Sequence, residues 1–142
     1  MWLVPIRPDI YYVTKELARN LQQPTQEDMA RLRHLLRYIK GTKHYVFQIV
    51  AHVTTFDLQV IELHVYVDSD RAGCRTTRKS ISGCVVTLFG CAIFHYSRTH
   101  GFIATSSGEA ELYAIGPGVA EALGIANFLS EGGLYPKVTI TI

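Results

Sequence analysis

The chain has 142 residues, of which 48% are hydrophobic and 18% are charged. This composition can form a buried core and argues against a disordered chain. The formal net charge of +2 is too small to predict a nucleic-acid partner by itself. No apolar run approaches the roughly 18 residues that span a bilayer, and the first five residues lack a signal-peptide pattern, so no membrane contact is expected. Three cysteines without a CxxC pair argue against a zinc site and predict a reduced, intracellular chain.

The first third of the chain predicts two antiparallel helices. Apolar residues at helical spacing predict the first helix: Ile10, Val13, Leu17 and Leu21. Pro24 ends it, and Thr25 followed by Asp28 resembles a capping box that starts the second. A second apolar stripe follows: Met29, Leu32, Leu36 and Ile39. A different face carries Arg33, Arg37 and Lys40, which could contact phosphates, although a solvated face is the commoner explanation of such a pattern. Gly41 is expected just after the helix.

The rest of the chain predicts strands around one long helix. Residues 45–50, 58–67, 82–88 and 91–96 are rich in strand-forming residues, and the last two segments are joined by a short turn at Phe89-Gly90. The last three segments suggest an antiparallel meander. A helix is expected from Ser106 or Ser107 to about Ser130, with a kink or break at Pro117 because proline cannot donate a helical hydrogen bond. Residues 138–142 alternate as a further strand does.

Carboxylates at the end of one predicted strand are the sharpest local feature. Asp68 and Asp70 lie two residues apart and so project from the same strand face. One explanation is that the two aspartates belong to a turn, where such residues are common. The other is that a bound divalent cation compensates their charge. Glu111, in the first turns of the long helix, could meet Asp68 if that helix crosses the sheet. Two such carboxylates can hold Mg²⁺ for phosphodiester hydrolysis. The alternative is that Glu109 and Glu111 only favour the helix N-terminus.

Several motifs together resemble a known family. They occur in the order YVDSD at 66–70, AG at 72–73, TRKSISG at 77–83 and SSGEAELYA at 106–114. In this order they resemble the ribonuclease H domain of copia-type LTR retrotransposon Pol polyproteins. RPDI at 7–10 and RHLLRYIKGT at 33–42 are similar to the end of the reverse transcriptase that precedes it.

The resemblance implies an α/β fold: a truncated ribonuclease-H-like mixed sheet with an antiparallel meander, one long helix and the start of a further strand, over residues 43–142. Residues 1–42 would form the preceding two-helix hairpin. The intact family hydrolyses the RNA strand of RNA·DNA hybrids with two Mg²⁺ or Mn²⁺ ions, and the remainder of the Pol polyprotein is the implied partner.

The resemblance also implies roles for individual residues. Asp68 and Glu111 match catalytic metal ligands, with Asp70 as a helper, whereas Glu109 matches a non-catalytic neighbour. The family's third Asp would follow residues 138–142, where this chain ends, so weak or absent activity is expected. The family usually has Trp at Arg71 and near Tyr96, and these departures cast doubt on normal packing under the first strand.

Basic and small residues near the carboxylates suggest contacts to nucleic acid. Arg75, Arg78 and Lys79 could hold phosphates, while the alternative is a turn that serves solubility. Ser107 and Gly108 are candidates for contact with the ribose 2′-hydroxyl. His95 and His100 lack metal-ligand spacing and are expected to be satisfied or surface residues. The second hypothesis is therefore a catalytically inactive ribonuclease-H-like remnant that binds nucleic acid or has a structural role. The resemblance leaves cytoplasm and nucleus open as locations.

Overall fold

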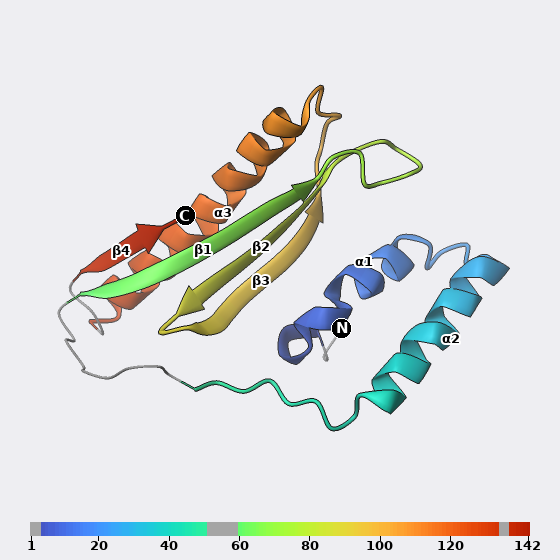
Figure 1. Cartoon of the computed structure of the whole chain (residues 1–142), viewed down its shortest axis with the longest axis horizontal. Coiled ribbons are helices and arrows are strands. Elements are labelled where there is room, and N and C mark those ends of the chain that lie inside the picture. Colours follow the sequence, from blue (N-terminus) through green and yellow to red (C-terminus); the bar gives the residue numbers. More distant parts are fainter. Residues whose placement is uncertain (1–3, 51–59, 134–136) are drawn as a thin grey trace. The chain divides into compact units, whose positions relative to one another are not determined.

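The computed structural model describes residues 4–50, 60–133 and 137–142. The chain divides into two compact units, Met1–Gln48 and Ile49–Ile142 (Figure 1). The first unit is helical. The second is a four-stranded sheet with one long helix. The chain therefore has the mixed α/β fold class that the sequence predicts.

The first unit is a pair of antiparallel helices. It contains two short 3₁₀ turns, η1 (Val4–Ile6) and η2 (Pro8–Ile10), followed by α1 (Tyr11–Arg19) and α2 (Gln26–Gly41). The expected capping box is confirmed, because the Thr25 hydroxyl accepts from the Asp28 amide and the Asp28 carboxylate accepts from the Thr25 amide. At the other end of the pair, the Arg7 guanidinium donates to the Thr42 carbonyl at 3.2 Å. Helix α2 includes Gly41 as its last residue, so it ends one residue later than predicted.

The apolar stripe predicted for α2 is mostly exposed: Met29, Leu32 and Leu36 are 48%, 36% and 56% exposed, and Ile39 is half-buried. Leu35, which lies outside that stripe, is buried. Periodicity shows which residues share a helix face, but it does not show which face a neighbouring element covers. A polar contact joins α2 to the 3₁₀ turn η2, where Tyr38 Oη donates to Asp9 Oδ2 at 2.8 Å.

The sheet of the second unit has the strand order β3-β2-β1-β4. Strands β1 (Ile61–Asp70), β2 (Ile81–Leu88) and β3 (Cys91–Thr99) form the expected antiparallel meander, and β4 (Val138–Thr141) pairs parallel to β1. Phe89 and Gly90 have positive φ angles, as a two-residue hairpin between twisted strands requires. Residues 45–50 form no strand, so that prediction is wrong. Residues 58 and 59 of the next predicted strand lie outside the described residues.

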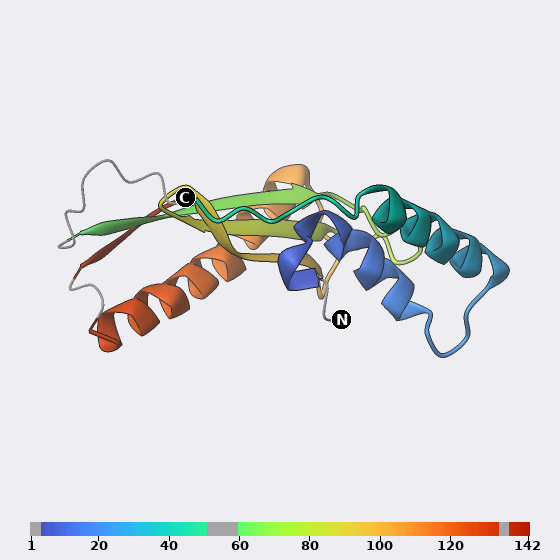
Figure 2. The same ribbon diagram turned by 90° about the horizontal axis from the view of Figure 1, so that it is seen from below.

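Helix α3 (Ser107–Glu131) covers one face of the sheet (Figure 2). It is continuous through Pro117, so of the kink or break predicted there, the break is absent. Proline removes a single backbone hydrogen bond, and the helical hydrogen bonds continue on either side of it. The buried residues of α3 recur every three or four positions along the helix: Ala110, Ala114, Gly118, Ala122, Ala126 and Leu129. Small side chains along this row let the helix axis lie close to the strands.

By length and composition alone, α3 could cross a bilayer. The sequence prediction concerned an uninterrupted apolar run, whereas α3 combines two apolar halves around Gly116 and Gly118. Core helices have the same length and composition, and α3 packs one face on the sheet.

Candidate functional site

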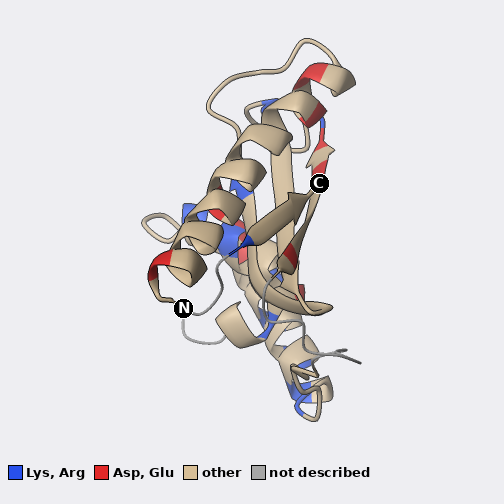
Figure 3. Cartoon of the chain, turned by 90° about the vertical axis from the view of Figure 1, so that its left-hand side faces the viewer, with Lys and Arg blue, Asp and Glu red and all other residues tan. Residues whose placement is uncertain are grey.

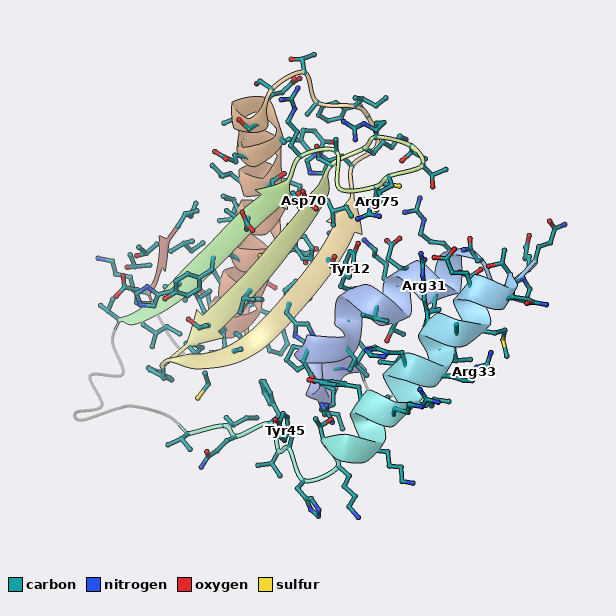
Figure 4. The ribbon with its side chains drawn as sticks, turned by 45° about the vertical axis from the view of Figure 1, so that its right-hand side comes forward. Tyr12, Arg31, Arg33, Tyr45, Asp70 and Arg75 are labelled. Carbon is teal, nitrogen blue, oxygen red and sulfur yellow. The ribbon has the colours of Figure 1, made fainter. Side chains whose placement is uncertain are left out.

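The two aspartates lie at the end of β1 and project from the same face, as their spacing predicts. Asp68 and Asp70 are both exposed, and Asp68 Oδ1 accepts a hydrogen bond from the Ser69 amide at 2.8 Å. In Figure 4, Asp70 is labelled at the end of β1 and Arg75 in the turn that follows. Their face is the one turned away from α3, because Val67, on the other face, lies against Gly118 of the helix.

The turn after Asp70 is fixed to the segment that leads into α3. The Arg71 guanidinium donates to the Thr105 carbonyl at 2.7 Å, and Lys79 Nζ donates to the Gly101 carbonyl at 2.6 Å. The Arg71 side chain thus bonds to the residue just before the helix cap. These bonds bring the end of β1 and the beginning of α3 to the same end of the unit.

The two glutamates at the start of α3 have different environments. Ser106 is the N-cap, and its hydroxyl accepts from the Glu109 amide at 3.0 Å. Glu109 Oε2 accepts from both the amide and the hydroxyl of Thr105, at 2.6 Å each. These bonds from Thr105 hold the pKa of the Glu109 carboxyl below its usual value. Glu109 therefore serves the helix cap.

Glu111 is exposed and has no such partner. Within residues 4–50, 60–133 and 137–142, neither Glu111 nor Asp68 nor Asp70 forms an ion pair. Helix α3 carries four glutamates and no Lys or Arg (Figure 3). Three unpaired carboxylates at one end of the unit offer the oxygen donors that Mg²⁺ prefers.

The structure brings these carboxylates to the same end of the unit but not to the same face of the sheet. Asp68 and Asp70 project away from α3, and Glu111 lies on the helix that covers the opposite face. In the part of the chain that the structure describes, no three His, Cys, Asp or Glu side chains form a group that could hold a metal ion. Any ion shared by Asp68 and Glu111 would lie around the end of β1.

The candidate nucleic-acid residues fall into two groups. Arg75 and Arg78 are exposed on the turn between β1 and β2, and Ser107 and Gly108 are exposed on the first turn of α3. Lys79 is half-buried and bonded to Gly101, so its ammonium group has a structural role. A surface hollow of about 360 Å³ lies beside this end of α3, lined by Phe102, Glu109, Leu112, Tyr113, Gly116 and Pro117.

A buried polar pair near the carboxylates is the feature that sequence reasoning missed. Ser82 and His100 are 3% and 5% exposed, and Ser82 Oγ lies 2.5 Å from His100 Nε2. The sequence predicts His100, like His95, to be a satisfied or surface residue. His100 is buried, but its Nδ1 has no hydrogen-bond partner among the described residues. Serines at 80 and 82, at the start of an otherwise apolar strand, were the available signal.

The fold and site define an α/β chain with unpaired carboxylates at the junction of a central strand and a covering helix. Over 135 residues, 95% of the chain, it is 32% identical to the retrovirus-related Pol polyprotein from transposon TNT 1-94 of Nicotiana tabacum. Over 133 residues, 94% of the chain, it is 30% identical to the corresponding polyprotein from transposon RE1 of Arabidopsis thaliana. An uncharacterized mitochondrial protein of Arabidopsis thaliana is 32% identical over 121 residues, 84% of the chain.

The chain is therefore homologous to a short region of copia-type retrotransposon Pol polyproteins. The match spans 10% and 9% of the two polyproteins and 48% of the mitochondrial protein. No family model matches the chain. No solved structure matches it either.

Proposed function

We propose that this chain derives from the ribonuclease H region of a copia-type Pol polyprotein, preceded by the end of the reverse transcriptase. The intact form would hydrolyse the RNA strand of an RNA·DNA hybrid. The observation that carries the proposal is the near-full-length homology to Pol polyproteins, read together with the motif order. The unequal roles of the two glutamates support it, because the helix cap engages Glu109 and leaves Glu111 free.

The residues present fit a divalent cation by their donor chemistry. Asp68 and Glu111 would hold the ion, with Asp70 as a helper, and all three are exposed oxygen donors without ion pairs among the described residues. Mg²⁺ or Mn²⁺, when bound, supplies an activated water and stabilises the leaving oxygen. Magnesium usually keeps several of its waters and is bound through one or two protein carboxylates, so these residues would suffice in number to hold it. We expect slow cleavage, because the described residues bring no group of three ligands together.

The test is a hybrid-cleavage assay in Mg²⁺ or Mn²⁺ with the full chain. We expect slow cleavage of the RNA strand that Asp68→Asn and Glu111→Gln each abolish. Glu131→Gln, at the far end of α3, is the matched control and should cleave as the parent does. Cleavage that survives both substitutions would remove the proposed roles of Asp68 and Glu111.

A second candidate is a catalytically inactive fragment that binds nucleic acid. The observation that favours it is the placement of Asp68 and Asp70 on the sheet face away from α3, while Arg75 and Arg78 remain exposed on the adjoining turn. Such a fragment would bind RNA·DNA hybrid in EDTA as well as in Mg²⁺, with affinity that falls as salt rises. Metal-dependent cleavage in the first assay would exclude it.

A further inference from the structure

His100 lies in a buried cluster between the sheet and α3. Its Nε2 lies 2.5 Å from Ser82 Oγ of β2, and its backbone amide donates to the Ser80 carbonyl at 2.8 Å. Burial lowers the pKa of the imidazole and so favours the neutral ring. A neutral imidazole has one donor and one acceptor, which suits a partner hydroxyl.

This cluster connects the two carboxylate-bearing elements. On the sheet side, Ser82 is paired across the strands with Ser69, which lies between Asp68 and Asp70. The Ser69 hydroxyl is itself buried without a partner among the described residues.

On the helix side, the His100 ring lies 4.9 Å from the ring of Tyr113, which follows Glu111 by two residues. Phe102 completes the contact, with its ring 5.8 Å from His100 and 4.4 Å from Tyr113. A continuous path of contacts therefore runs from the end of β1 to the first turns of α3.

We propose that neutral His100 is a positioning residue that holds the first turns of α3, and with them Glu111, against the end of β1 and the start of β2, and that protonation of His100 releases them. The importance of Glu111 rests on the proposed function. The pH-dependent hold of His100 on the start of α3, called the latch below, does not rest on it.

The physical reason is the absence of a compensating charge. The side chains against the His100 ring are Ser82 from β2, Tyr113 from α3 and Phe102 from the connecting segment. Of these described neighbours only Tyr113 is titratable, and none is a carboxylate. An imidazolium at this place would be buried without a carboxylate, so it must be hydrated, and hydration separates the helix start from the sheet.

The primary test is amide hydrogen exchange of residues 107–114 in the full chain, expressed as protection factors at pH 7.5 and pH 5.5. We expect protection in the parent to fall as the pH drops below 6.5, the ordinary pKa of histidine, by at most about tenfold at pH 5.5. His100→Gln keeps a neutral hydrogen-bonding side chain and should show little change between the two pH values. The matched control, His64→Gln on an exposed face of β1, should behave as the parent does.

Two further measurements keep the proposal falsifiable. In the parent, the loss of protection should begin near pH 6.5 and level off at the pH where an NMR titration shows the folded His100 ring to protonate, which tests the idea even if His100→Gln fails to fold. Mn²⁺ binding should weaken more between pH 7.5 and 5.5 in the parent than in His100→Gln. Unchanged protection across the His100 titration would overturn the latch. A protection change without Mn²⁺ binding at either pH would support the latch and count against the proposed function.

Discussion

Gly118 of α3 lies so close to Val67 of β1 that a Cβ atom at position 118 would come within 2.6 Å of Val67 Cγ1. Gly124, two turns later, has open space at the same place. The two glycines therefore separate the effect of helix propensity from the effect of close packing.

Gly118→Ala should lower the free energy of unfolding by about 1–3 kcal/mol, because the added methyl overpacks the contact with Val67. Gly124→Ala should raise it by about 1 kcal/mol, because alanine is the better helix former and meets nothing. Chemical denaturation of both variants measures the difference. Val67→Ala combined with Gly118→Ala should recover part of the loss. An unfolding free energy of Gly118→Ala at or above that of the parent would contradict the close approach.

Glu109→Gln should lower the thermal midpoint at pH 7, because it removes the charge that accepts two hydrogen bonds from Thr105. Since the pKa of Glu109 is lowered in the folded chain from 4.5, its contribution is present above about pH 4.5 and is lost as the pH falls through the folded pKa. Glu111→Gln is the matched comparison and should melt as the parent does. Equal destabilisation by both changes would argue against a capping role for Glu109 alone.

Acid should weaken the helical unit through two carboxylates. Hydrogen bonds from Arg7 lower the pKa of Asp9 to about 2, and bonds from Thr25 lower that of Asp28 to about 2, both from 3.8. A depressed folded pKa means that the stabilisation is complete above about pH 4 and is lost as the pH falls towards 2. Circular dichroism at 222 nm should report this loss, and Asp28→Asn should reduce it. Glu27→Gln, at an exposed neighbouring position, should leave the acid transition unchanged.

Arg75→Ala and Arg78→Ala should each weaken hybrid binding and reduce the slope of log K against log salt by about 1, because each removes one phosphate contact. Fluorescence anisotropy with a labelled hybrid between 50 and 200 mM salt, roughly the range over which such contacts are felt, measures the slope. Arg98→Ala is the comparison, because Arg98 is already paired with Glu121 at 2.7 Å. A slope that is the same in all three variants would exclude this turn as the binding surface.

Local patterns in the sequence were enough to predict most of the elements. Thr25 and Asp28 predict the start of α2, Phe89-Gly90 predicts the hairpin, and the alternation after residue 137 predicts β4. These features depend on neighbouring residues in the chain. By contrast, residues 45–50 have strand-forming side chains but no strand partner, so the β-propensity there is not realised.

The candidate site was harder to predict because its parts come from separate elements. The spacing of Asp68 and Asp70 correctly places both on one strand face. It does not show which face α3 covers, because that depends on where small residues such as Gly118 and Ala114 allow the helix to lie. The His100–Ser82 pair depends on the register between β2 and β3, which no local pattern in the sequence specifies.

Each of the three cysteines is buried, and they occupy different places: Cys74 in the turn after β1, Cys84 beneath α3, and Cys91 at the hairpin end. Burial raises the pKa of the Cys84 thiol and so disfavours its reactive thiolate while α3 covers it. The alkylation rate of each cysteine therefore reports how often the region around it opens to solvent. Comparing the three rates shows which of these regions opens most readily.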